Sequence, residues 1–345
     1  MKFKLVLENG LEFIGDNFGC NEETIGEIFF NTSMVGYQDI LSDPSYYGKI
    51  ACMTYPLIGN YGLTDEDYDF KNIHVKGYVV KENNDFPSNF RETRTLSDAM
   101  EENKVVGISD IDTREITKII RDNGLLKAII TNVETSLPEC LEKLANYKEE
   151  DNLVEKVSCK KIWYSRTANP THTVVIVDLG VKTTLVKKLN SYGLNVIVVP
   201  YNTTLEQIKK LKPNGIIISN GPGNPNKLVE IIELVNILKT KYTTLGLGLG
   251  AQLLALTYGA KVNKMKHVHQ GANIPVRNLA TNKIEITSQN HFYAISELNE
   301  EVKVNEESIV GNDIEMFTSN NHKVIGVQYN LTESVIENFV KVMKR

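Results

Sequence analysis

The sequence has few cysteines, and its second half has none. The four that occur are Cys20, Cys52, Cys140 and Cys159. They show no Cys-x-x-Cys spacing and are too few for a disulfide framework in a chain of 345 residues, so we expect reduced thiols. No cysteine nucleophile can therefore come from the chain beyond residue 159.

Long apolar runs and a strong charge of either sign are also absent. The N-terminal residues MKFKLVLENG alternate like a strand and contain no apolar stretch of the signal-peptide kind, and no run approaches membrane-spanning length. A net charge of -5 gives no reason to expect nucleic acid or an anionic membrane as a partner. These features predict a cytoplasmic protein.

The periodicity predicts two domains joined by a linker, with residues 1–148 as the first domain. Alternating runs flank Asn9-Gly10, which is the strongest short signal for a hairpin. Further strands are predicted at 26–31, 49–55 and 74–80, and a helix is predicted between Asp112 and Gly124. Apolar periodicity fades over residues 149–171, which we expect to be the linker.

Residues 172–345 alternate between strand and helix and predict a second domain of the α/β class. Continuous apolar strands between amphipathic helices indicate a mostly parallel sheet that helices cover on both faces. Right-handed crossovers then bring the loops that follow the strands to one edge. The predicted strands are 174–177, 196–199 and 215–219, and the predicted helices are 182–190, 205–211 and 228–238.

One glycine-rich stretch, residues 243–259, predicts a strand, a sharp turn and a helix. The turn reads Gly246-Leu247-Gly248-Leu249-Gly250, which matches the Gly-x-nucleophile-x-Gly elbow with a glycine in the nucleophile's place. The spacing also fits a dinucleotide fingerprint, but no Asp or Glu occurs between Thr240 and Ile284 to bind a ribose hydroxyl. A turn that only allows close packing of helix on strand is the remaining alternative.

The elbow and two stretches of the first domain resemble the small, glutamine-hydrolysing subunit of carbamoyl-phosphate synthetase. The family elbow reads GICLGHQLLAL, and this chain has GLGLGAQLLAL. Residues 30–50 (FNTSMVGYQDILSDPSYYGKI) and 107–124 (GISDIDTREITKIIRDNG) look like the family's N-terminal domain. The resemblance implies a mixed α+β domain followed by a class I glutamine amidotransferase-like domain.

The resemblance also implies a catalytic triad whose three positions are replaced here. In the family, a Cys on the elbow attacks the glutamine amide, and a His and a Glu come from a Gln-Gly-His-Pro-Glu run. Gly248 stands in the place of the Cys, Asn330 in that of the His and Thr332 in that of the Glu. None of these residues can act as nucleophile or general base, so we expect no glutamine hydrolysis. Glu333, His322 and His291 lie nearby in sequence, but a base without a nucleophile restores nothing.

The residues that would bind glutamine are better retained than the triad. By resemblance, backbone groups of two loop glycines and of the elbow face the substrate. One residue of the first domain reaches across to the glutamine pocket, and side chains of the second domain contact the substrate. Phe292 replaces a family glycine, and its ring is expected to fill part of the pocket. The implied set is Ser45, Gly221, Gly223, Leu249, Gln252, Asn290, Phe292 and Tyr293.

These observations predict a small subunit without glutaminase activity, which binds a large subunit that uses ATP. Together they would form carbamoyl phosphate from ammonia, for pyrimidine or arginine biosynthesis. No metal or cofactor is expected in this chain, and ATP and Mg²⁺ are expected on the large subunit. Two alternatives remain open. One is an amino-acid sensor that stands alone and keeps a modified glutamine pocket, and the other is a glutaminase with an unrecognised nucleophile.

Overall fold

The computed structural model describes residues 1–65 and 72–344. The chain divides into two compact units, Met1–Glu150 and Asp151–Arg345. Residues 149–171, expected to be a linker, instead carry helix α5 (Leu153–Val157) and strand β10 (Trp163–Ser165). Because β10 pairs with strand β12 (Leu194–Pro200), most of this segment belongs to the second unit.

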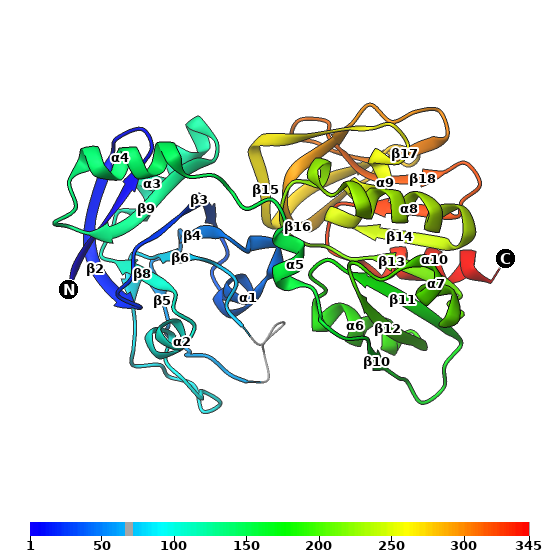
Figure 1. The fold of residues 1–345 in the computed structure, drawn as a ribbon, viewed down its shortest axis with the longest axis horizontal. Helices are drawn as coiled ribbons and strands as arrows, with labels where there is room; N and C mark the ends of the chain where they lie inside the picture. The colour runs from blue at the N-terminus through cyan, green and yellow to red at the C-terminus, as the bar shows by residue number, and fades with distance from the viewer. Residues whose placement is uncertain (66–71, 345) are drawn as a thin grey trace. The chain divides into compact units, whose positions relative to one another are not determined.

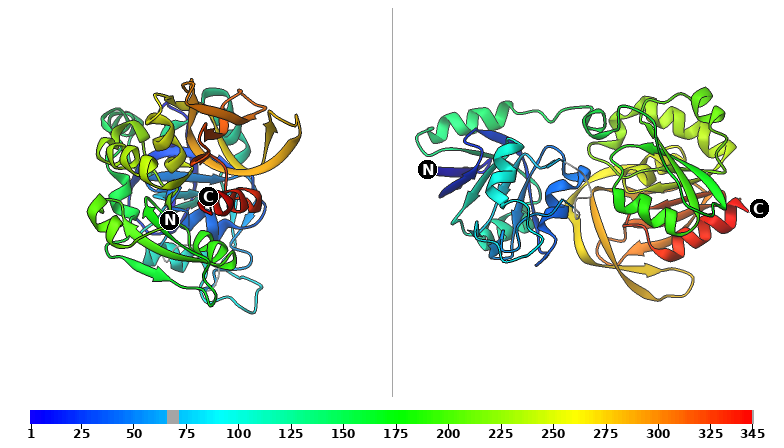
Figure 2. Two further views of the ribbon diagram at one scale, coloured as in Figure 1. Left: turned by 90° about the vertical axis from the view of Figure 1, so that its right-hand side faces the viewer. Right: turned by 90° about the horizontal axis from the view of Figure 1, so that it is seen from below.

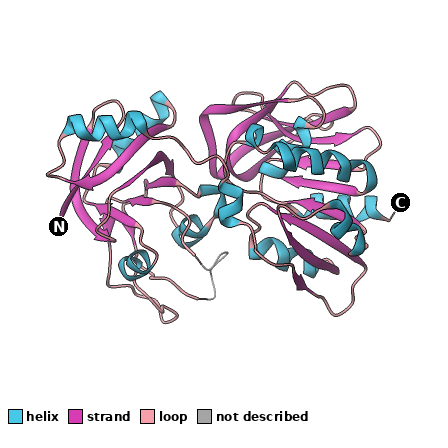
Figure 3. Ribbon diagram, in the orientation of Figure 1, coloured by secondary structure: helices cyan, strands magenta, loops and turns pink. Residues whose placement is uncertain are grey.

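The first unit is built around a closed barrel of strands (Figures 1 and 3). The expected hairpin at Asn9-Gly10 is confirmed, since β1 and β2 pair antiparallel and Gly10 takes a positive φ of 87° between them. In barrel order the strands are β1 (Lys2–Leu7), β2 (Glu12–Gly19), β8 (Val106–Ser109), β6 (Gly77–Val79), β4 (Lys49–Met53), β3 (Thr24–Asn31) and β9 (Leu126–Asn132).

Alternation along β1 explains how the barrel buries both of its faces. Phe3, Leu5 and Leu7 pack in one cluster with Ile116 of helix α3. Val6 points the other way and packs with residues of helix α4. The other elements of this unit are α1 (Tyr37–Ser42), η1 (Pro44–Tyr46), β5 (Leu57–Ile58), β7 (Glu82–Asn83), α2 (Leu96–Glu102), α3 (Thr113–Asn123) and α4 (Leu137–Asn146).

The second unit contains one mixed sheet whose parallel part was predicted. Within residues 151–344 the sheet has ten strands, in the order β10-β12-β11-β13-β14-β19-β18-β16-β15-β17. Neighbours from β12 to β19 are parallel, as expected for strands separated by helices. These strands are β12, β11 (His172–Asp178), β13 (Gly215–Ile218), β14 (Thr243–Leu247) and β19 (Val324–Val327).

Helices cover both faces of the parallel strands, so the predicted layering is confirmed. Val175 and Val177 of β11 pack in a cluster with helices α8 and α9 on one face. Val174 and Ile176 pack on the other face with helices α6 and α10. The helices of this unit are α5, α6 (Thr183–Ser191), α7 (Leu205–Lys210), η2 (Pro225–Lys227), α8 (Val229–Lys241), α9 (Leu249–Leu256) and α10 (Glu333–Met343).

The other half of the sheet is antiparallel and was not predicted. Strands β15 (Lys261–Asn278) and β16 (Ile284–Ser296) form a long curved hairpin, drawn in yellow and orange in Figure 2. Strands β17 (Val302–Ser308) and β18 (Ile314–Ser319) complete this half. Among the described residues, no helix combines the length and the apolar character needed to cross a membrane.

Candidate functional site

The predicted elbow lies between strand β14 and helix α9, at the edge of the sheet where the parallel strands end. Gly248 joins the two elements with φ 51° and ψ −113°. Its N–H donates to the carbonyl of Val327 at 2.9 Å, which ties the turn to the neighbouring strand β19. Its own carbonyl accepts from Gln252 N–H at 3.1 Å and so begins the helix. The backbone therefore turns as the nucleophile elbow formula predicts.

The glycines on either side of Gly248 are required by close packing. A Cβ on Gly250 would lie 2.1 Å from the carbonyl oxygen of Ile218 in strand β13. A Cβ on Gly246 would lie 2.6 Å from the carbonyl oxygen of Gly250. Neither position can hold a side chain unless the backbone moves, because helix α9 lies directly against strands β13 and β14.

Gly248 differs from both of its neighbours because space exists for a side chain. The nearest atom to an added Cβ is Asn220 Cβ at 3.3 Å, and that contact is tight but not prohibitive. The cost of a side chain would come from the positive φ, a conformation that L-residues rarely adopt. Since glycine adopts this conformation without strain, the turn at position 248 keeps its shape without a side chain.

The other two triad candidates follow strand β19. Leu247 pairs with Val327 in parallel register, so Gly248 and the residues after Val327 lie at the same sheet edge. Asn330 is exposed, and its side-chain nitrogen donates to Ser288 Oγ at 3.0 Å. Thr332 precedes helix α10, and its hydroxyl contacts that of Ser334 at 3.0 Å. The residues that follow β19 thus bring an amide, from Asn330, and a hydroxyl, from Thr332, to the chain beyond this sheet edge.

Of the nearby histidines, one lies at the far end of strand β19 and the other has partners within the sheet. His322 lies in the turn just before strand β19, which places it at the opposite end of that strand from Val327. His291 is buried, and its two ring nitrogens contact the Tyr293 carbonyl and Gln289 Oε1, both at 2.9 Å. Burial lowers the pKa of His291. Glu333 is the first residue of α10 and is exposed.

The loop after strand β13 carries the first predicted pocket residues. A Cβ on Gly221 would lie 2.1 Å from the Leu179 carbonyl oxygen, and Gly223 has φ 96°, so both glycines are required by the local backbone. Ser219 Oγ accepts from Leu179 N–H at 2.9 Å and joins this loop to the one after β11. Leu249 starts helix α9 with its side chain in the core. The structure thus brings Gly221 and Leu249 to the edge that holds the elbow.

Gln252 makes internal contacts rather than offering its amide nitrogen to a ligand. Its Nε2 donates to Gln328 Oε1 at 2.9 Å and to the Tyr293 carbonyl at 3.0 Å. The side chain is 3% exposed. These bonds connect helix α9 to strand β16 and to the residue that follows strand β19, and so fix the orientation of the elbow helix.

The remaining predicted residues lie on two different units. Asn290, Phe292 and Tyr293 lie on strand β16, where Asn290 pairs with Gln270 of β15 and Phe292 is buried. Ser45 belongs to the first unit, is buried in η1, and donates its backbone N–H to Asp43 Oδ1 at 2.9 Å. Contact of Ser45 with a glutamine pocket stays a prediction, as does ligand binding by the β16 residues.

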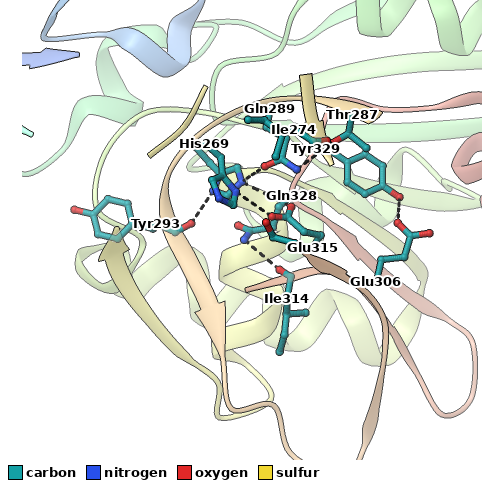
Figure 4. A network of polar contacts seen from close by, with 12 residues as sticks. His269, Ile274, Thr287, Gln289, Tyr293, Glu306, Ile314, Glu315, Gln328 and Tyr329 are labelled. Carbon is teal, nitrogen blue, oxygen red and sulfur yellow. Dashed lines mark hydrogen bonds and ion pairs between the residues drawn. The ribbon is translucent and has the colours of Figure 1, made fainter. Parts of the chain in front are cut away.

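Sequence reasoning did not single out a buried polar cluster on strands β15, β16 and β18 (Figure 4). His269 Nδ1 lies 3.1 Å from Glu315 Oε1, and His291 Nε2 lies 3.8 Å from Glu315 Oε2. Burial acts to lower the pKa of His269, but the hydrogen bond and charge of Glu315 outweigh it and raise the pKa. The three residues come from separate strands, so only the antiparallel pairing could have revealed them.

Comparison with known proteins assigns both units. Residues 5–130 match the family model "Carbamoyl-phosphate synthase small chain, CPSase domain", and residues 175–330 match "Glutamine amidotransferase class-I". A carbamoyl phosphate synthase small chain from Fusobacterium nucleatum is 44% identical over 292 residues, which is 85% of this chain and 81% of that protein. A pyrimidine-specific small chain from Bacillus subtilis is 42% identical over 317 residues, 90% of this chain and 86% of that one.

Among solved structures, a glutamine amidotransferase from Thermotoga maritima aligns with a TM-score of 0.38. Its identity to this chain is 17%, and the alignment covers 50% of this chain and 82% of that one.

Substitution of the elbow glycines tests the positive φ at Gly248 and the close packing at Gly250. We expect Gly248→Ala to lower the free energy of unfolding by about 1–3 kcal/mol, the cost of one strained residue. Gly250→Ala should lower it by more than about 3 kcal/mol, because the new Cβ collides with the Ile218 carbonyl. Urea unfolding of the two variants measures both. Equal losses would contradict the geometry of the turn.

Proposed function

The chain belongs to the carbamoyl-phosphate synthase small-chain family, and on that premise we propose that it is a small subunit that has lost glutamine hydrolysis. In this proposal it serves as a structural or regulatory subunit of an ammonia-using synthetase. The observation that carries the proposal is Gly248, which occupies the turn between β14 and α9 without any side chain.

The chemistry of amide hydrolysis explains why this one residue matters. Attack on a glutamine amide needs a nucleophile on the elbow, a base to take its proton and a group that orients the base. At the sheet edge Asn330 and Thr332 offer an amide and a hydroxyl, which cannot accept a proton near neutral pH. Members of such a triad act as a unit, and loss of the nucleophile alone costs about 10⁶ in turnover.

A role beside a large subunit follows from the family rather than from the site. The curated relatives are small chains of carbamoyl phosphate synthases, and the first unit matches the family model for the small chain. We propose that this chain likewise binds a large subunit, which would hold ATP and Mg²⁺. Either pyrimidine or arginine biosynthesis could use the product. The relative from Bacillus subtilis is named pyrimidine-specific.

We expect no glutamine hydrolysis by the full chain, either alone or mixed with its large subunit. The reason is that Gly248, Asn330 and Thr332 provide neither thiolate nor base. Release of glutamate from glutamine should stay at the rate of a blank without protein. Hydrolysis above that rate, abolished by a substitution in the second unit, would support an unrecognised nucleophile and overturn the proposal.

We expect the chain to co-elute with its cognate large subunit in size-exclusion chromatography at micromolar concentration. A stable interface of this kind buries at least about 1,000 Å² of surface. The complex should also alter the rate of ammonia-dependent carbamoyl phosphate synthesis by the large subunit. Separate elution without any effect on that rate, together with a thermal shift caused by glutamine, would instead support a sensor that stands alone.

The scaffold suggests that the site can be rebuilt. Gly248→Cys with Asn330→His and Thr332→Glu restores the triad, and Phe292→Gly shortens a buried side chain on β16. We expect this quadruple variant, in complex with a large subunit, to hydrolyse glutamine measurably. Gly248→Cys alone should fail, because a thiol with a pKa near 8.5 and without a base is a weak nucleophile.

The triple variant that keeps Phe292 is the matched control. We expect it to be much less active than the quadruple variant if the ring blocks the pocket. Equal activity of the two would show that Phe292 does not obstruct glutamine. Absence of activity in both, with unfolding midpoints near that of the parent chain, would show that the catalytic geometry is no longer held within the fraction of an ångström that such a site requires.

A further inference from the structure

The buried cluster of His269, His291 and Glu315 has a geometry that its hydrogen bonds do not explain. His269 and His291 face each other across β15 and β16, with ring centroids 5.2 Å apart. Glu315 approaches both rings from β18, and its side chain is 0% exposed. Its Oε2 has no hydrogen-bond partner among the described residues. An unpaired carboxylate oxygen in such a place is costly.

The contacts around His291 show where its protons are. Thr287 Oγ1 donates its proton to the Ile274 carbonyl at 3.0 Å and so must accept from Gln289 Nε2, also at 3.0 Å. This orientation leaves Gln289 Oε1 facing His291 Nε2 at 2.9 Å. On the other side of the ring, Nδ1 contacts the Tyr293 carbonyl at 2.9 Å and must donate to it.

Neutral His291 therefore directs a lone pair, not a proton, at two oxygens. The ring has one N–H, which the Tyr293 carbonyl uses, so Nε2 faces Gln289 Oε1 and Glu315 Oε2 without a hydrogen between them. A proton on Nε2, a proton on Glu315 Oε2 or a metal ion at this point would make the arrangement favourable. The 3.8 Å between His291 Nε2 and Glu315 Oε2 is too long for a hydrogen bond, so a proton cannot bridge them. A metal ion between the two atoms would contact both, which makes the metal the better occupant.

We propose that this cluster is a structural site for a divalent transition metal, with Zn²⁺ as the best match. His269 Nδ1, His291 Nε2 and a Glu315 oxygen would be ligands, and Gln289 Oε1 would be the fourth. Tetrahedral ligands at about 2.0–2.1 Å from zinc are about 3.3 Å apart. His269 Nδ1 lies 3.1 Å from Glu315 Oε1, and His291 Nε2 lies 3.8 Å from Glu315 Oε2. One ligand atom of each of the three residues lies within 4.8 Å of the other two, so the side chains would rotate to close around the ion.

The surroundings favour this assignment in two ways. Imidazole nitrogens suit zinc better than they suit Mg²⁺ or Ca²⁺, which take oxygen ligands. The bond from His291 Nδ1–H to a backbone carbonyl is the outer-shell contact that usually fixes a metal-binding histidine. Four protein ligands would close the site to substrate, so the metal would join strands β15, β16 and β18 and have no catalytic role. This inference is independent of the proposed function.

The test is the metal content of the full-length chain, produced without a histidine tag in medium supplemented with Zn²⁺ and passed through gel filtration. We expect about one zinc per chain. Glu315→Gln and His269→Gln should remove it, with a loss of affinity greater than the roughly 100-fold that a supporting contact can explain. His267→Gln is the matched control, because His267 is exposed on the same strand, and it should keep the metal.

A second measurement decides the question if the cluster variants do not fold. The parent chain produced with Co²⁺ should show the intense visible absorption of a tetrahedral site, and an excess of Zn²⁺ should abolish it. Zinc below about a tenth of an equivalent in the parent chain, or full occupancy in folded His269→Gln, would overturn the proposal. A weak, octahedral type of Co²⁺ spectrum would overturn it as well. Each of these three results would leave a proton on His291 or Glu315, and not a metal ion, as the occupant.

Discussion

The approach of helix α9 to strands β13 and β14 is the constraint on which the candidate site depends. An added Cβ at Gly250 would lie 2.1 Å from a carbonyl of β13, so the helix can lie this close only because glycine is present. Gly250 N–H donates to the Ser219 carbonyl at 3.1 Å, which fixes the loop after β13 against the same helix. The elbow, the loop and the start of α9 are therefore positioned by packing and not by any catalytic contact.

This separation of scaffold from chemistry explains how a nucleophile can be absent from an intact elbow. A turn with positive φ is strained for every residue except glycine, and families that place a catalytic residue there must tolerate that strain. Glycine at position 248 relieves it while preserving the bond to Val327. Glycine at this position is therefore neutral or favourable for folding.

The sequence predicted those parts of the structure that depend on local patterns. Continuous apolar strands and amphipathic helices indicated the parallel sheet, and Asn9-Gly10 indicated the first hairpin, because both signals are local. The antiparallel strands β15 to β18 escaped prediction. Their residues are mostly polar or half-exposed, and β15 pairs with β16 through two register shifts that interrupt simple alternation. The segment 149–171 was misjudged because five helical residues and a short edge strand give little periodicity.

In the candidate site, too, the places of residues along the sheet were easier to predict than the hydrogen bonds of their side chains. The alternation of strand and helix predicted that the loops with Gly221 and Gly248 meet at one sheet edge, whereas Asn330 was identified only by resemblance. The pairing of β14 with β19 places Asn330 after the neighbouring strand. The bonds of Gln252 depend on pairing of distant strands and could not be seen in the sequence. Gln328 joins the elbow helix to strand β18 through two hydrogen bonds. Its side chain accepts from Gln252 on the elbow helix, and its backbone N–H donates to the Glu315 carbonyl at 2.8 Å.

The buried cluster and the elbow helix are thus connected by one chain of hydrogen bonds. Glu315 contacts His269 of β15 with its side chain at 3.1 Å, and its backbone carbonyl accepts from Gln328 N–H. Gln328 in turn accepts from Gln252 of helix α9. Buried polar networks of this kind give rigidity when their members are satisfied, and Glu315 Oε2 is the member that the proposed metal would satisfy. A network so connected keeps the elbow in place whether or not a nucleophile stands on it. These polar groups therefore support helix α9 in addition to the packing of its glycines against β13 and β14.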